Sequence, residues 1–268
     1  MSPSSAVPPS QHPLPHEKDV PPLAIGSARG HCESRLARHF HGVRLSRARR
    51  PNFTAARQRP LLVYCNHPSW WDPVVCMQLA SQLLPGRRHF APIEVAALRR
   101  HRWLSRLGFF AVDPESASGA RRFFEQASHI LEQPDATLWA PACGLADPRQ
   151  RPLELYPGLG HVAARARHAA LLPLALEYPF WAEPLPEALA RFGEQQIAED
   201  VGMRAPDWTE MLTEWLQNAQ DALAAEALAR DESDFEVICG NGTSVHDAWS
   251  RLRAILRSRG RANTAGPA

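Results

Sequence analysis

A histidine and an aspartate follow a short apolar segment of the chain and could act together as a catalytic base. His67 lies two residues after the run 61–65, which reads Leu-Leu-Val-Tyr-Cys, and Asp72 lies five residues after His67. A carboxylate bound to one nitrogen of a neutral imidazole fixes its tautomer and leaves the other nitrogen able to accept a proton. The pair therefore predicts general-base chemistry, although such a spacing also arises by chance between surface residues.

The spacing of the pair limits which elements can carry it. On one regular helix, residues five apart point about 140° away from each other, so His67 and Asp72 could not meet there. The run 61–65 is typical of a strand buried on both faces of a parallel sheet, and Pro68 favours the first turn of a following helix. We therefore expect His67 at a strand-to-helix turn, where the helix dipole keeps the imidazole neutral.

The rest of the central region alternates between strand-like and helix-like segments. The apolar residues of 119–133 repeat at helical spacing, and 153–163 predicts a loop that enters a helix. Alternation of this kind is typical of βα units, so the expected fold class is α/β, with a mostly parallel central sheet flanked by helices. Further strands are expected at 89–94, 107–113, 138–141 and 171–178.

These motifs resemble those of the glycerolipid acyltransferases, the family that includes lysophosphatidate acyltransferase. The resemblance rests on Asn-His-x4-Asp at 66–72, on the strand that carries Glu94, and on Gly-Phe-Phe-x-Val-Asp at 108–113; it runs from about residue 60 to 180. It implies that His67 deprotonates the hydroxyl of a lipid acceptor with Asp72 as its partner. It also implies an acyl thioester of CoA or acyl carrier protein as donor, with no metal or other cofactor. The residues that it assigns to substrate binding are Asn66, Ser69, Glu94, Gly108, Phe109, Asp113 and Gly144.

The third motif of the family is altered in this chain. The family's Phe-Pro-Glu-Gly-Thr-Arg matches the stretch 138–147, in which Gly144 is kept. Cys143 stands at the glutamate position and Ala146 at the arginine position, and Pro114 replaces the arginine that follows the second motif.

The two missing arginines bear on the acceptor. The family uses them to hold the acceptor's phosphate, and arginine binds phosphate through a planar bidentate fork that alanine and proline cannot imitate. We therefore expect an acceptor that is not a simple phosphomonoester. Arg149 and Arg151 lie close by in the sequence and could take over a phosphate, so they are further candidates for substrate binding.

The chain is expected to hold one α/β domain with extensions. Residues 1–25 predict a disordered tail rich in Pro and Ser, and 26–200 predict the acyltransferase domain, opening with a basic amphipathic helix. Residues 201–260 predict a helical extension and 261–268 a second disordered tail. Within the extension, an amphipathic helix after Asp207, its expected cap, either covers the sheet or lines an acyl-chain groove.

A basic segment near the N-terminus bears on location. Between residues 29 and 50, arginines alternate with apolar side chains, which is typical either of a helix on an anionic membrane or of an Arg-rich helix packed on the core. The longest apolar stretches are about half of the roughly 20 residues that span a bilayer, and no signal peptide is visible. We therefore expect a cytoplasmic protein in peripheral contact with the inner face of the membrane.

Composition adds few constraints. An apolar content of 44% leaves room for a substantial core, and a net charge of +2 does not indicate a nucleic-acid partner. Five cysteines without a Cys-x-x-Cys motif suit a reducing cytosol, and Lys18, the single lysine, is typical of a GC-rich bacterial genome.

Two other functions stay open on the sequence alone. The altered third motif would also suit a catalytically weak relative that binds acyl chains or lipids, although such a protein needs no base with an orienting carboxylate. A thioesterase with Cys143 as nucleophile is a more distant alternative, since no histidine can be assigned to it. The intact His67 and Asp72 favour an O-acyltransferase.

Overall fold

The computed structural model describes residues 22–51, 53, 58–100, 109–113, 116–198 and 202–240. Its strands are β1 (Gly42–Ser46), β2 (Leu61–Cys65), β3 (Arg88–Glu94), β4 (Phe109–Val112), β5 (Ala136–Pro141), β6 (Ala170–Glu177), β7 (Glu187–Phe192), β8 (Gln196–Ile197) and β9 (Phe235–Gly240). Its helices are α1 (Ile25–His39), α3 (Asp72–Leu83), α4 (Val95–Arg100), α6 (Ala117–Ile130), α7 (Pro157–Arg165), α8 (Ala205–Ala229) and the short 3-10 helix η1 (Glu232–Asp234).

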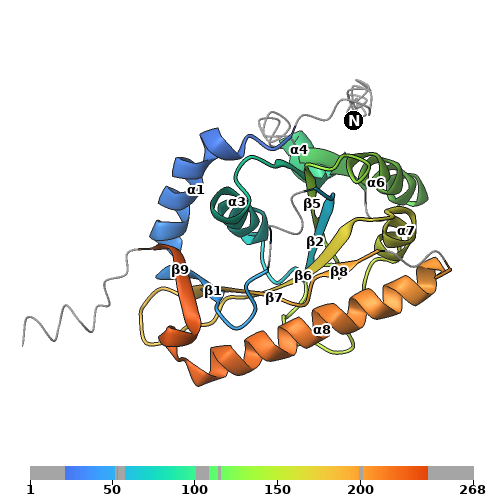
Figure 1. Ribbon diagram of the computed structural model, residues 1–268. Coiled ribbons are helices and arrows are strands. Elements are labelled where there is room, and N and C mark those ends of the chain that lie inside the picture. Colours follow the sequence, from blue (N-terminus) through green and yellow to red (C-terminus); the bar gives the residue numbers. More distant parts are fainter. Residues whose placement is uncertain are drawn as a thin grey trace, which may run out of the picture.

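One sheet forms the centre of the described structure. Its strands lie in the order β4-β3-β5-β2-β6-β7-β1-β9, and β8 pairs with β6. The first five run parallel to one another, β7 and β1 run the opposite way, and β9 returns to the first direction. The fold class is therefore α/β, with a mostly parallel central sheet flanked by helices, as the sequence predicts (Figure 1).

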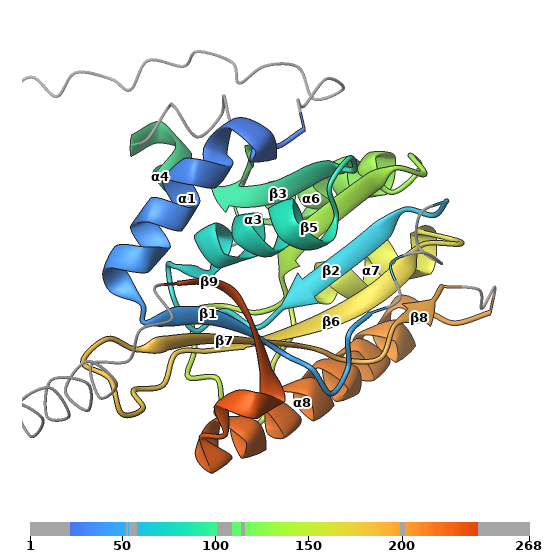
Figure 2. The same ribbon diagram turned by 60° about the vertical axis from the view of Figure 1, so that its left-hand side comes forward.

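Helices cover both faces of this sheet. α1 and α3 lie on one face, and α6, α7 and α8 lie on the other (Figures 1 and 2). In β2, Val63 and Cys65 belong to the core under α3, whereas Leu62 and Tyr64 belong to the core under α7 and α8. Within the described part of the chain, no helix combines the length and the apolar character that crossing a membrane requires.

The packing of α7 on α8 depends on a glycine. A Cβ atom at Gly160 would collide with the carbonyl oxygen of Ala205 and the hydroxyl of Thr209. Where the two helices meet, Trp208 and Leu212 of α8 are buried in the core under the sheet. Of the two expected roles for α8, covering the sheet is therefore the one observed.

The spacing of the basic segment 29–50 predicts a single helix, but the structure shows a helix followed by a strand. α1 ends at His39 and the chain enters β1 at Gly42. Leu36 of α1 is buried in the core against α3, so the apolar face of this helix serves the fold and is not free to enter a membrane. All five residues of β1 are buried between β7 and β9, and this strand pairing outweighs the local helical spacing.

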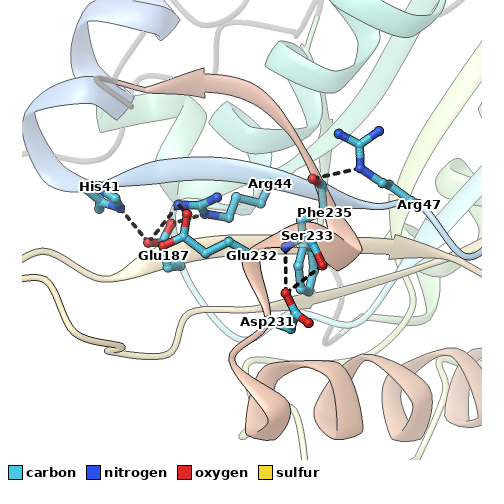
Figure 3. A network of polar contacts seen from close by, with 8 residues as sticks. All are labelled: His41, Arg44, Arg47, Glu187, Asp231, Glu232, Ser233 and Phe235. Atoms are coloured by element: carbon cyan, nitrogen blue, oxygen red, sulfur yellow. Dashed lines mark hydrogen bonds and ion pairs between the residues drawn. The ribbon is translucent and has the colours of Figure 1, made fainter. Parts of the chain in front are cut away.

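Arg44, one of the arginines of that segment, is buried in β1 next to carboxylate partners (Figure 3). Its Nε donates to Oε2 of Glu187 at 2.8 Å, and its Nη2 lies 3.2 Å from Oε2 of Glu232. Nδ1 of His41 lies 2.6 Å from Oε1 of the same Glu187. A buried charge needs such partners, and this network joins β1, β7 and the turn before β9.

The C-terminal region is not wholly helical. The N-cap of α8 is Arg204 rather than Asp207, whose carboxylate lies one turn inside and accepts from the Arg204 N–H at 3.1 Å. β9 pairs with β1, so the segment expected as an extension over 201–260 contributes a strand to the main sheet. At the other end Leu23 is buried, so the tail expected over 1–25 includes a core residue. Residues 1–21 and 241–268 lie outside the described residues.

Candidate active site

Three neighbouring strands bring distant segments of the chain to one edge of the sheet. β5, β2 and β6 lie side by side and run parallel, so their carboxyl ends share that edge. His67 follows β2, Gly144 follows β5 and Tyr178 follows β6. Ligands of α/β sheets bind at this edge, because the loops after the strands meet there.

His67 and Asp72 are in direct contact. Nδ1 of His67 lies 2.5 Å from Oδ2 of Asp72. The Asp72 side chain is 4% exposed and that of His67 is 28% exposed. A buried carboxylate in this position holds the Nδ1–H tautomer and leaves Nε2 as the nitrogen that can accept a proton.

The turn that joins β2 to α3 differs from the expected one. Pro68 does not open the helix, because α3 begins at Asp72. The backbone N–H of Ser69 donates to Oδ2 of Asp72 at 3.2 Å, which closes the intervening loop. Asp72 therefore occupies the first turn of α3, where the helix dipole favours its negative charge, and the loop carries His67 back to it.

Asn66 and Ser69, which the resemblance assigns to substrate binding, make hydrogen bonds that shape the loop. The Asn66 side chain donates to the carbonyl of Leu176 at 2.9 Å and accepts from the N–H of Leu176 at 2.8 Å, which ties the end of β2 to β6. The Ser69 hydroxyl accepts from the Trp71 N–H at 3.2 Å. Both residues therefore position the histidine between them.

A cavity of about 580 Å³ opens beside His67 and Asp72, which we call the dyad. This lies within the roughly 300–1,000 Å³ typical of ligand pockets. Its inner wall, between α3 and the sheet, is formed by Leu23, Cys76, Met77, Ala80, Ala91 and Trp139. Its outer part, against β4, α6 and α7, is formed by Val112, Ala120, Phe123, Pro157 and Leu159. Among the described lining residues there is no arginine or lysine, and the charged groups are His67, Asp72 and Glu94.

The remaining residues assigned to substrate binding divide between the cavity and its surroundings. Glu94, Phe109 and Gly144 line the cavity. Asp113 follows β4 in an exposed position and does not line it. Gly108 lies outside the described residues.

Arg149 and Arg151 are paired with carboxylates and do not line the cavity. Nη2 of Arg149 lies 2.5 Å from Oε1 of the buried Glu177, and Arg151 forms an ion pair with Asp221 of α8. Either guanidinium would have to give up its partner before it could bind a phosphate in the cavity.

Three thiols, those of Cys65, Cys76 and Cys143, line the cavity next to the dyad. The hydrogen bond with Cys76, together with burial, raises the pKa of the Cys65 thiol well above its ordinary value. Burial likewise raises the pKa of the Cys143 thiol. Since the thiolate is the nucleophile, these surroundings do not favour a thioesterase that uses Cys143.

Sequence reasoning missed Tyr178, whose hydroxyl donates to Oδ1 of Asp72 at 2.6 Å. The available signal was topological: Tyr178 is the first residue after a strand that pairs with β2 in parallel. The first residues after two such strands meet at one edge of the sheet.

Sequence reasoning also missed His89, which holds the side chain of Trp139 in the wall of the cavity. Trp139 Nε1–H donates to Nδ1 of the buried His89 at 3.0 Å, and Nε2 of His89 lies 3.2 Å from the Leu84 carbonyl oxygen. This pattern requires the neutral imidazole with its proton on Nε2. Burial lowers the pKa of His89 to about 4, which keeps the ring neutral.

Comparisons with known proteins are consistent with this geometry. A family model described as Acyltransferase matches residues 39–177 of the chain. No curated protein sequence matches. Among solved structures, the chain is similar to the 1-acyl-sn-glycerophosphate (LPA) acyltransferase PlsC from Thermotoga maritima, at 14% identity over 75% of this chain and 80% of that chain, with a TM-score of 0.52. At this identity the likeness concerns the fold alone.

We expect His89→Gln to remove part of the acid sensitivity of the fold. Because the pKa of His89 is about 4 in the folded chain and 6.5 in its ordinary state, the unfolded chain binds more protons between these values. The free energy of unfolding should therefore fall as the pH drops from about 6.5 toward 4, and it should fall less steeply in the variant. Urea unfolding across this range measures the slope. His129→Gln, at an exposed position on α6, is the control, and a wild-type slope in His89→Gln would contradict the prediction.

Proposed function

We propose that this chain, which belongs to the acyltransferase family, moves a fatty acyl group from a thioester of CoA or acyl carrier protein to a hydroxyl of a lipid acceptor. The observation that carries the proposal is the contact between Nδ1 of His67 and Oδ2 of Asp72 beside a largely apolar cavity. Such a reaction needs an oriented base next to a site that accepts a hydrocarbon chain.

In this mechanism, Nε2 of His67 accepts the proton of the acceptor hydroxyl while the hydroxyl oxygen attacks the thioester carbonyl. Asp72 stays ionised and stabilises the imidazolium. Backbone N–H groups near Gly144, which lines the cavity, stabilise the oxyanion of the tetrahedral intermediate. The intermediate then collapses, the carbon–sulfur bond breaks, and the leaving thiolate takes the proton back from His67. The products are an ester and a free thiol.

The inner wall of the cavity suits the acyl chain of the donor. Leu23, Met77 and Ala80 present hydrocarbon side chains to it, between α3 and the sheet. Each methylene that leaves water for such a wall contributes about 0.8 kcal/mol. This arrangement supports a fatty acyl group rather than a short acyl group as the transferred unit.

The charges of the site support an acceptor without a phosphate. The described lining of the cavity offers the Glu94 carboxylate but no arginine or lysine. A phosphate dianion would be taken from water without a charge-assisted partner and beside a like charge, both of which are unfavourable. Arg149 and Arg151 are already paired with Glu177 and Asp221.

Exposed apolar side chains surround the edge at which the site opens. We call them the apolar rim; they follow β2, β5 and β6 and are Trp70 (61% exposed), Leu145 (69%), Phe180 (64%) and Leu185 (38%). Arg35, in the second half of α1, lies over the ring of Trp71 next to this rim. Apolar side chains beside basic ones suit the surface of an anionic bilayer, so we propose peripheral contact with the inner face of the cytoplasmic membrane through the rim.

His67→Ala should reduce acyl transfer by about a thousandfold, and Asp72→Asn by less but still about a hundredfold, because the base or its orientation is lost. The assay follows thiol release from acyl-CoA in the presence of a total lipid extract, with circular dichroism to verify folding. His31→Ala, at an exposed position on α1, is the matched control and should keep the wild-type rate. A folded His67→Ala variant with the wild-type rate would rule out the mechanism. A wild-type protein that binds acyl-CoA without turnover would instead support the lipid-binding alternative.

The acceptor proposal predicts slower acylation of lysophosphatidate than of a phosphate-free hydroxy lipid at equal concentration. Two missing charge-assisted contacts should lower the preference for phosphate by about a hundredfold or more. The backbone N–H of Ala146 donates to the His67 carbonyl at 3.1 Å, so Ala146→Arg places a guanidinium near the base and should recover part of that preference. Arg151→Gln is the control and should leave the ratio of rates unchanged. A wild-type preference for lysophosphatidate that Arg149→Gln abolishes would overturn the acceptor proposal while leaving acyl transfer intact.

The rim predicts the effect of polar substitutions on membrane binding. The double variant Phe180→Ser, Leu185→Ser should bind vesicles of phosphatidylglycerol and phosphatidylethanolamine several-fold more weakly than the wild type, because it loses buried apolar area. Val237→Ser replaces a half-exposed side chain on β9 and should bind as the wild type does. Co-sedimentation measures both, and equal binding of the double variant and the wild type would exclude the rim as the contact surface.

A further inference from the structure

The hydroxyl of Tyr178 bonds the oxygen of Asp72 that His67 does not contact. It donates to Oδ1 at 2.6 Å, while Oδ2 lies 2.5 Å from Nδ1 of His67 and accepts from the Ser69 N–H at 3.2 Å. We infer that Tyr178 is a positioning residue for the base, because it orients the Asp72 carboxylate and sets how strongly that carboxylate holds a proton on His67. The inference rests on the proposed function, in which His67 is the base.

Burial of Asp72 makes this contact consequential. The residue is 3% exposed, so hydrogen-bond donors rather than bulk water must stabilise its charge. Donors on Oδ2 alone would leave Oδ1 without a partner and the carboxylate free to turn about its terminal torsion, which is soft. The Tyr178 hydroxyl supplies the missing donor and fixes the plane in which Oδ2 meets His67.

The hydrogen bond from Tyr178 to Asp72 also weakens the attraction between the carboxylate and the proton on His67. A donor to Oδ1 stabilises the negative charge of Asp72 and so weakens its attraction for the proton on the imidazolium. Burial, followed by the charge and the hydrogen bond of Asp72, raises the pKa of Tyr178 well above its ordinary value. The hydroxyl therefore stays protonated and remains a donor over the whole working range of pH.

Packing from α1 holds the tyrosine ring in place. Phe40 is the C-cap of α1. The centroid of its ring lies 5.4 Å from that of Tyr178 and 5.3 Å from that of Trp71, the residue before Asp72. The donor and the start of α3 are thus braced by one buried side chain from a distant part of the chain. A donor held by packing delivers its hydrogen bond with little loss of side-chain freedom.

Other titratable groups surround the dyad, but they come from different elements and none replaces the phenol. The hydrogen bond with Cys76, together with burial, raises the pKa of the Cys65 thiol, and burial raises that of the Cys143 thiol. A neutral thiol is only a weak hydrogen-bond donor. The groups that face the dyad or its loop are Cys65 at the end of β2, Cys76 on α3, Cys143 after β5, Glu94 at the end of β3, and Arg35 and His39 on α1.

The test is the pH–rate profile of Tyr178→Phe, which keeps the ring and its packing but removes the hydroxyl. Without the donor, the dyad should hold its proton to higher pH, so the acid limb of the profile should move upward by about one pH unit. At a pH well above this limb, the rate should remain about tenfold below the wild type, because the carboxylate is no longer held in plane. Substrate KM should change little, since Tyr178 does not line the cavity.

Tyr64→Phe is the matched control. Tyr64 is a fully buried tyrosine on β2 whose hydroxyl has no hydrogen-bond partner among the described residues. Its loss removes the same atom from the same fold without touching Asp72, so the profile should match the wild type. A purely structural role for the Tyr178 hydroxyl would lower the stability of Tyr178→Phe without moving its acid limb.

Incorporation of 3-fluorotyrosine at position 178 provides a second variant that retains the hydroxyl. A more acidic phenol is a stronger donor, so the acid limb should move downward, opposite to Tyr178→Phe. An unmoved limb in both variants would overturn the inference, and if Tyr178→Phe fails to fold the fluorinated protein decides alone. Failure of the proposed function is distinguishable, because it would appear as wild-type activity in His67→Ala whatever the profile of the Tyr178 variants.

Discussion

The structure of the site depends on keeping one carboxylate charged while it is buried. Asp72 lies at the first turn of α3, where the helix dipole favours its charge, but its side chain is almost wholly removed from water. Its hydrogen-bond partners come from three places: the imidazole of His67, the backbone of Ser69 and the hydroxyl of Tyr178. Each must arrive within hydrogen-bond distance for the charge to be tolerated, so the requirements of Asp72 constrain the loop, the sheet and α1 together.

The central sheet meets this requirement by placing β2 beside β6. The two strands pair in parallel with Cys65 opposite Leu174, and the Asn66 side chain extends the connection by bonding both backbone groups of Leu176. The residues that follow the two strands are therefore held at a set separation. Because the sheet is parallel here and buried on both faces, the residues at this edge have little conformational freedom. This suits His67, which must keep its orientation to act as a base.

Charge is distributed unevenly around this edge, and the distribution bears on substrate choice. The arginines nearby serve the fold: Arg44 is buried against Glu187, and Arg149 is paired with Glu177, the residue before Tyr178. The described lining of the cavity is instead mainly hydrocarbon, with the Glu94 carboxylate at its margin. A site built in this way suits apolar chains and neutral hydroxyls better than phosphate, because the guanidinium groups of Arg44 and Arg149 are already paired with buried carboxylates.

The sequence by itself determined the α/β class, the strands around 61–65 and 171–178, the helix that became α8, and the candidate pair His67 and Asp72. These follow from patterns that are local in the chain: continuous apolar runs, helical spacing, and two functional residues five positions apart. Only the tertiary structure decided that part of the basic segment 29–50 is the strand β1, that Asn66 ties strands together, and that Tyr178 completes the shell of Asp72. Those outcomes depend on pairing between segments more than a hundred residues apart in sequence, as with Asn66 and Leu176. The free energy of such pairing overrides the local preference of a segment for helix or strand, and neither segment carries a periodic pattern that names its partner. For this physical reason, these three outcomes could not be predicted from the sequence.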